Sequence, residues 1–241
     1  MNSPIAKIHR TFILLSVFCI AMGFLESIVV VYLRQIYYPM GFEFPLKLFS
    51  PEMVLIEWIR EIATIIMLVT IGILADKDNL RRFLYFLFSF AIWDLFYYVG
   101  LKLFLNWPSS LLTWDVLFLI PLPWISPVLA PVICSLTMIF FAVSMMYKAD
   151  NSYKLVIRRN DWGLLILGSL IIFASFIQDY FILNLNNGLL LKLRGFPENK
   201  EFMQIISSYK PITYNWYLFI LGEIIILWAI IRLIKQRKLK N

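Results

Sequence analysis

The sequence predicts an all-α, multi-pass membrane protein: a helical bundle with about six transmembrane helices. Of its 241 residues, 61% are hydrophobic and 15% are charged, whereas soluble domains average roughly 45–50% apolar and about 25% charged residues. The mean hydropathy is +0.79. Six apolar stretches reach the ~20 residues that a helix needs to cross a bilayer, and they make the chain a single integral membrane domain. They cover about residues 12–33, 53–75, 83–104, 125–147, 162–184 and 216–234.

The first stretch could be a cleaved signal peptide or a retained helix. Lys7 and Arg10 precede it, as in a secretory signal. The apolar run nevertheless continues to Leu33, which is longer than the roughly 7–15 residues usual for a signal peptide. We therefore expect a retained helix.

The connections between the stretches differ on the two sides. Two short connections offer helix-capping side chains, Asp76–Asn79 before the third stretch and Asn160–Asp161 before the fifth. The connections 34–52 and 185–215 are longer and contain aromatic residues, prolines and turn signals. No internal repeat or soluble domain is evident.

The segment before the fourth stretch is unusual. Trp114 to Ile120 is apolar but short, and prolines follow at Pro121, Pro123, Pro127 and Pro131. Prolines at this density preclude a regular helix, and irregular backbone at membrane depth occurs only where protein or a cavity surrounds it. The segment is therefore either re-entrant, with Asp115 near the mouth of a polar site, or an interfacial loop.

The distribution of basic residues predicts the orientation. With the N-terminus inside, fourteen Lys and Arg residues fall on the inner side and seven on the outer side, while Arg60 lies inside a stretch. Because cytoplasmic loops carry an excess of Lys and Arg, both termini are expected in the cytoplasm of a cell membrane, either plasma or bacterial inner. The net charge of +7 is thus mainly a topology signal, and we expect no nucleic-acid partner.

Several chemistries are excluded by composition. Cys19 and Cys134 lie in separate stretches outside any CxxC motif, and His9 is the only histidine. The chain therefore lacks ligands for a haem or a structural zinc site, and it has no nucleotide-binding motif. Any chemistry must use carboxylates, hydroxyls, aromatic side chains and Arg60.

Carboxylates inside the apolar stretches are the most informative feature. An ionisable group in the membrane costs about 2.5–3.5 kcal/mol on insertion scales and is functional by default. With alternating helix directions and about 1.5 Å of rise per residue, all of these acids lie roughly 6–15 Å below the outer surface. We therefore infer one acidic site open to the outside. The acids are Glu26, Glu57, Glu61, Asp94, Asp179 and Glu223.

Local spacing adds neighbours to these acids. Glu57, Arg60 and Glu61 share one helix face because they are three and four residues apart. Asp94 is followed at the same spacing by Tyr97 and Tyr98, and Trp93 precedes it. The predicted binding site comprises Glu26, Glu57, Arg60, Glu61, Trp93, Asp94, Tyr97, Tyr98, Asp115, Asp179 and Glu223.

The first functional hypothesis is binding or transport of a cation, namely a proton, a divalent metal or an organic amine. Clustered carboxylates suit hard divalent cations, for which Glu26, Glu61 and Asp94 are the candidate ligands. The aromatic residues around Asp94 suit an ammonium group. Transport is less favoured because the inner half of the bundle contains none of these acids and no repeat is visible.

The second hypothesis is an intramembrane enzyme acting on a lipid or isoprenoid at the outer leaflet. Paired carboxylates can act as general acid and base, with or without a divalent metal. Asp94 with Asp179, or Glu57 with Glu61, would form the catalytic pair, and Arg60 would orient an anionic head group.

The third hypothesis is an accessory or assembly subunit whose acids contact partner helices. Its partner would be a second copy of the chain or another subunit of a membrane complex. Cation binding or transport ranks first. Across the three hypotheses the expected partners are the lipid bilayer and a small cation or a lipid-like ligand.

Overall fold

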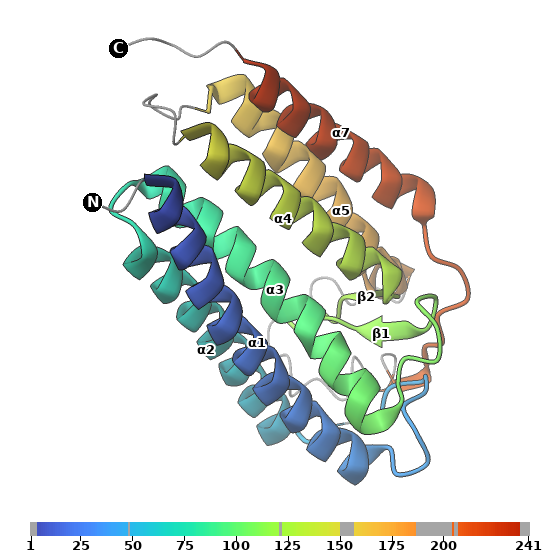
Figure 1. The fold of residues 1–241 in the computed structure, drawn as a ribbon. Coiled ribbons are helices and arrows are strands. Elements are labelled where there is room, and N and C mark those ends of the chain that lie inside the picture. Colours follow the sequence, from blue (N-terminus) through green and yellow to red (C-terminus); the bar gives the residue numbers. More distant parts are fainter. Residues whose placement is uncertain are drawn as a thin grey trace.

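The described residues form six helices and one two-stranded hairpin (Figure 1). The computed structural model describes residues 4–47, 49–120, 122–149, 157–186, 204 and 207–236. All six helices are long and apolar enough to cross a membrane, so the prediction of an all-α chain with six membrane-spanning candidates is confirmed. The elements are α1 (Pro4–Tyr37), α2 (Pro51–Ala75), α3 (Asn79–Leu105), β1 (Trp114–Val116), β2 (Ile125–Pro127), α4 (Leu129–Ala149), α5 (Arg159–Asn186) and α7 (Trp216–Lys235).

Helix α3 organises the bundle. Helices α1 and α2 both pack along α3 and make little contact with each other. Helix α4 packs against α3 as well, while α5 and α7 pack together and α7 also touches α4. Both chain ends lie at the same end of the bundle, and the hairpin lies toward the opposite end (Figure 1).

Side chains fix several helix ends. The Ser50 hydroxyl accepts a hydrogen bond from the backbone N–H of Met53 at 3.3 Å, at the start of α2. The Asp78 carboxylate accepts one from Arg81 N–H at 3.0 Å, which confirms the cap predicted in the 76–79 connection. Asn215 caps α7 in the same way, since unpaired N–H groups at a helix start need acceptors.

The half of the bundle that carries the termini is filled by apolar side chains. Buried residues of five helices and Ile157, two residues before α5, meet there in one cluster, so this half contains a packed core. Its largest buried members include Phe12, Leu84, Tyr85, Phe88, Phe141, Met145, Met146, Ile230 and Leu233.

The proline-rich segment forms the hairpin. Strand β1 pairs antiparallel with β2, Asp115 opposite Ser126. The described part of this segment contains no helix before Leu129, as the prolines predict; Pro121 lies outside the described residues. Helix α4 begins four residues after the predicted start, and Pro131 falls in its first turn, where a missing N–H costs nothing. Membrane entry of this segment stays a prediction.

Polar contacts also tie the helices together at the terminus end. The Lys148 ammonium donates to the backbone carbonyls of Leu233 at 2.5 Å and Ile234 at 3.1 Å, at the end of α7. The buried Asp161 carboxylate accepts from the Gln236 side chain at 2.6 Å and lies 3.1 Å from Arg232 Nε. The prediction that Asp161 caps α5 is therefore wrong. Helix α5 begins two residues earlier, and the Asp161 carboxylate contacts Arg232 of α7 and the adjacent Gln236 instead.

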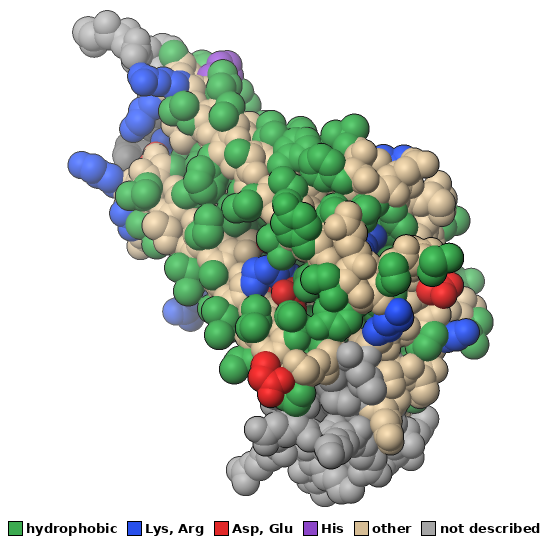
Figure 2. Space-filling view, turned by 90° about the horizontal axis from the view of Figure 1, so that it is seen from below, with side chains coloured by type: hydrophobic (Ala, Val, Ile, Leu, Met, Phe, Trp, Pro, Cys, Tyr) green, Lys and Arg blue, Asp and Glu red, His purple; other side chains and the backbone are tan. Residues whose placement is uncertain are grey.

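The outer surface of the helices is apolar. Large exposed side chains occur along all six helices, among them Ile13 and Leu14 on α1 and Ile66 on α2. Figure 2 shows apolar side chains over much of the visible face and several Lys and Arg side chains grouped toward one side. A lipid-facing surface has this character, so the helices form a membrane-embedded bundle.

The contact between α5 and α7 can be tested at a glycine. A Cβ atom on Gly168 would lie 2.8 Å from the Gly222 carbonyl oxygen and 2.6 Å from Ile226 Cγ1, whereas one on Gly163 would meet nothing within 4 Å. We expect Gly168→Ala to reduce stability by about 1–3 kcal/mol through overpacking. Gly163→Ala, on the same helix, should not lower the thermal midpoint in detergent. Equal midpoints for both variants would contradict the close approach.

Candidate functional site

A cavity of about 170 Å³ lies between α1, α2, α3 and the hairpin segment, in the half of the bundle away from the termini. Residues of the loop after α1, including Phe42 and Lys47, complete its wall. Most of the lining is apolar or aromatic. Five carboxyl groups and three basic groups also line it, so ionisation of all of them gives the cavity a negative excess.

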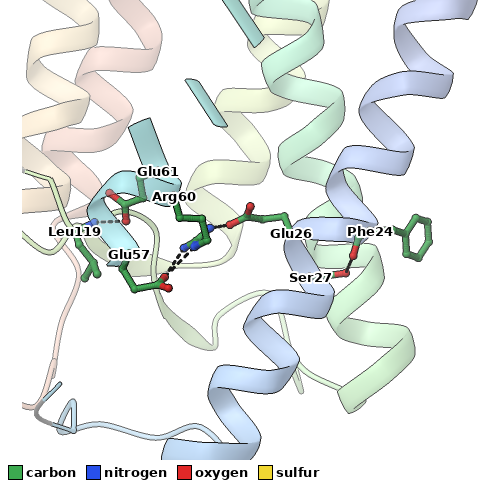
Figure 3. A network of polar contacts seen from close by, with 7 residues as sticks. All are labelled: Phe24, Glu26, Ser27, Glu57, Arg60, Glu61 and Leu119. Carbon is green, nitrogen blue, oxygen red and sulfur yellow. Dashed lines mark hydrogen bonds and ion pairs between the residues drawn. The ribbon is translucent and has the colours of Figure 1, made fainter. Parts of the chain in front are cut away.

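Arg60 joins two helices across this cavity. Its Nε and Nη2 atoms donate to Glu57 Oε2 at 2.9 and 2.7 Å, one turn away on α2. Its Nη1 atom forms an ion pair with Glu26 of α1 (Figure 3). The side chain of Arg60 is 24% exposed, whereas that of Glu57 is 5% exposed. One guanidinium group thus neutralises part of the charge of two carboxylates.

Glu61 lies beside this triad but has a different environment. Its Oε1 atom accepts a hydrogen bond from the backbone N–H of Leu119 at 2.8 Å, which ties α2 to the hairpin segment (Figure 3). Its Oε2 atom is buried and has no close hydrogen-bond partner among the described residues, although the backbone of Ile120 lies near the carboxylate. A buried polar atom without a partner costs about 1–3 kcal/mol and calls for an explanation.

Arg34 and Asp115 form a second charged centre. Arg34 Nη2 donates to Asp115 Oδ1 at 3.2 Å, and the Tyr98 hydroxyl donates to Asp115 Oδ2 at 3.2 Å. The Arg34 guanidinium lies 3.7 Å from the centre of the Trp107 ring and 4.4 Å from that of Phe42. Burial raises the pKa of the Asp115 carboxyl, while the charge of Arg34 acts in the opposite direction.

Arg34 belongs to α1, whereas the sequence placed it at the start of the connection 34–52. The spacing could have identified it, because Glu26, Val30 and Arg34 are four residues apart and all line the cavity. Residues at this spacing occupy one face of a helix. The face of α1 that carries Glu26 therefore also carries Arg34, two turns closer to the hairpin end.

Three residues of α3 complete the polar lining. Asp94 Oδ2 accepts a hydrogen bond from the Ser135 hydroxyl of α4 at 2.8 Å. The buried indole N–H of Trp93 has no hydrogen-bond partner among the described residues. Tyr97 also lines the cavity, and its ring packs on that of Tyr98 with centroids 5.0 Å apart.

Two predicted site residues lie elsewhere. The Asp179 carboxylate accepts a hydrogen bond from the Tyr209 hydroxyl at 2.7 Å, and Glu223 accepts one from Thr137 at 2.9 Å. They belong to α5 and α7, which pack together on the α4 side of the bundle, and neither lines the cavity. The suggested pair of Asp94 with Asp179 does not share this cavity, whereas Glu57 and Glu61 do. The other predicted residues line it: Glu26, Glu57, Arg60, Glu61, Trp93, Asp94, Tyr97, Tyr98 and Asp115.

The candidate metal ligands do not form a cluster. Glu26, Glu61 and Asp94 all line the cavity, but each has a different partner. Across the part of the chain that the structure describes, no three His, Cys, Asp or Glu residues are close enough to hold a metal ion. The arrangement therefore suits a ligand that meets the carboxylates one at a time.

Comparison with models of protein families, with curated proteins and with solved structures found no match for this chain.

The Arg60 triad can be tested by a double-mutant cycle. Arg60→Gln leaves Glu26 and Glu57 close together without their cation, and breaking a buried ion pair costs about 3–5 kcal/mol. We expect a lower thermal midpoint in detergent, with partial recovery when Glu57→Gln is added. Arg81→Gln is the control, because Arg81 lies outside the cavity and its Nη1 atom is 4.0 Å from Asp76 Oδ2. Additive effects of the two substitutions would contradict the ion pair.

Proposed function

We propose that this multi-pass membrane protein binds an amphiphilic organic cation, with the ammonium head in the cavity and the apolar tail toward the lipid. The observation that carries the proposal is Glu61 Oε2, a buried carboxylate oxygen in the cavity lining that lacks a hydrogen-bond donor. An ammonium group supplies both the missing donor and a compensating charge.

The charge of the lining supports a cationic head group. Arg60 is shared by Glu26 and Glu57, and Arg34 is paired with Asp115. Glu61 and Asp94 have hydrogen bonds from neutral groups only. A positive ligand reduces the resulting negative excess, because buried charges are stable when they are paired. Aromatic residues in the same wall offer ring faces to an ammonium group.

The apolar lining supports a hydrocarbon tail. Helices α1 and α2 make little contact with each other, and the cavity lies between them. Its lining is mostly apolar, and the outer faces of both helices are apolar as well. A tail attached to a head group near Glu61 can therefore pass between these helices into the hydrocarbon of the membrane.

The packed core supports binding in preference to transport. Apolar side chains fill the bundle between the cavity and the terminus end. A permeation path through that half would need polar groups or water, since an isolated charge in an apolar medium is costly. The proposed site is therefore reached from one side of the membrane.

An outer-leaflet enzyme is the second candidate. Glu57 and Glu61 line one cavity but differ in environment, since Arg60 neutralises the first and a backbone N–H contacts the second. Two carboxylates in unlike surroundings can act as acid and base in one reaction. A lipid-like substrate would then occupy the same cavity.

We also propose that both termini are cytoplasmic and that the cavity lies in the outer half of the membrane. This orientation can be tested with single cysteines in a variant that lacks Cys19 and Cys134. With a membrane-impermeant maleimide on intact cells, Ser109→Cys should react, and Lys77→Cys should react only after permeabilisation. Both positions are exposed and lie at opposite ends of α3. The opposite labelling pattern would contradict this orientation.

Cation binding can be tested with dodecylammonium in a non-ionic detergent. A ligand that binds the native state raises the thermal midpoint in a saturable way. Glu61→Gln should weaken this binding roughly tenfold, which corresponds to about 1.4 kcal/mol. Glu52→Gln is the matched control, because Glu52 is exposed on the same helix. Equal responses of the two variants, or an equal effect of dodecanol, would overturn the proposal.

A further inference from the structure

We propose that Arg34 and Lys47 form an anion subsite in the same cavity, so that the ligand is a zwitterionic amphiphile with an amine and a phosphate group. The inference rests on the proposed function for the amine and adds the phosphate. The matching chemistry is that of a phosphoethanolamine head group.

Arg34 has a buried donor that no described residue uses. Only Nη2 contacts Asp115, and Nη1 is buried without a hydrogen-bond partner. The side chain is 8% exposed and lines the cavity. Because guanidinium groups bind carboxylate and phosphate oxygens with paired N–H donors, the unused donor of a residue that lines the cavity suits such an oxygen.

The surroundings hold this guanidinium in place. Trp107 and Phe42 contact it through their ring faces, and Asp115 fixes one edge. Asp115 also accepts a hydrogen bond from Tyr98, so Arg34 is not the only donor to that carboxylate among the described residues. A rigid, stacked guanidinium loses little freedom when it binds an anion.

Lys47 adds a second positive charge to the lining. Its backbone N–H donates to the Tyr38 hydroxyl at 2.7 Å, and its ammonium group lies 5.4 Å from the centre of the Tyr38 ring. The side chain is exposed and lines the cavity. Lys47 can therefore contact a phosphate that also reaches Arg34.

The anion and amine subsites lie at different depths. Arg34 is two turns from Glu26 along α1, or about 12 Å at 1.5 Å per residue. Glu26 pairs with Arg60, the neighbour of Glu61 on α2. A ligand with its anion at Arg34 therefore has its amine on the Glu61 side.

The same head group occurs in a membrane lipid and in a soluble phosphomonoester, and four probes separate these sources. Dioctanoyl phosphatidylethanolamine carries phosphate, amine and tail. Dodecylammonium lacks the phosphate, dioctanoyl phosphatidylglycerol lacks the amine, and phosphoethanolamine lacks the tail. We expect the first probe to bind roughly tenfold more tightly than dodecylammonium. Tightest binding by phosphoethanolamine would assign the site to a soluble ligand and overturn the lipid assignment.

Asp115→Asn gives the sharpest test. This substitution removes the anion that competes for Arg34, so affinity for both phosphate-bearing lipids should rise several-fold while that for dodecylammonium should not. A purely structural Arg34–Asp115 pair predicts no gain for any probe. The double variant Arg34→Gln with Asp115→Asn leaves no buried charge unpaired and should abolish the preference for phosphate. Its thermal midpoint without ligand reports whether it folds.

Lys47→Gln should weaken binding of the phosphate-bearing lipids, and Lys210→Gln, at an exposed position outside the cavity, is its control. Dodecylammonium binding that depends on Glu61, combined with no phosphate preference, would overturn the anion subsite and leave the proposed function intact. Loss of amine dependence together with binding of phosphatidylglycerol alone would overturn the proposed function.

Discussion

The need to pair every charge inside hydrocarbon is the constraint on which the rest of this structure depends. Arg60 is the cation that two carboxylates share, one on its own helix and one on α1. Helices α1 and α2 each pack on α3 and have little other contact with each other, so this ion triad links them directly. The three residues of the triad also line the cavity, so one charge group takes part both in the contact between helices and in the cavity wall.

The hairpin segment obeys the same constraint. Its irregular backbone needs partners for its polar groups, and the Glu61 carboxylate of α2 supplies one of them, while the Arg34 guanidinium of α1 pairs with a hairpin side chain. Glu61 accepts from Leu119 N–H, and Asp115 of β1 pairs with Arg34. The acids of the cavity therefore hold the hairpin in position and also define the polar character of its wall. Substitutions of these charged residues are therefore best designed in pairs, because removal of one partner leaves the other as an unpaired buried charge.

The sequence predicts the membrane spans and the residues that are neighbours along each helix. It does not predict which helices pack next to each other. Apolar length located six helices, and helical spacing grouped Glu57, Arg60 and Glu61. Depth alone placed Asp179 and Glu223 with the other acids, but α5 and α7 pack on the α4 side. Lateral order depends on side-chain packing, to which hydropathy is insensitive. Arg34 was counted as a loop charge because it follows the apolar run, although its spacing from Glu26 places it on the same helix face.

The two arginine centres differ in a way that bears on their roles. Arg60 is 24% exposed, and its two carboxylate partners lie on α1 and α2. Its contacts therefore neutralise charge between these two helices. Arg34 is 8% exposed, has one carboxylate partner and retains an unused donor. An arginine whose N–H donors are all paired, such as Arg60, is suited to a structural role. An arginine with an unpaired N–H donor between aromatic rings, such as Arg34, can also bind a ligand. Glu61 is likewise only partly paired, because its Oε2 atom is an acceptor without a close hydrogen-bond donor. An unused donor on α1 and an unused acceptor on α2, both on residues that line one cavity, favour the proposed zwitterionic ligand over a simple cation.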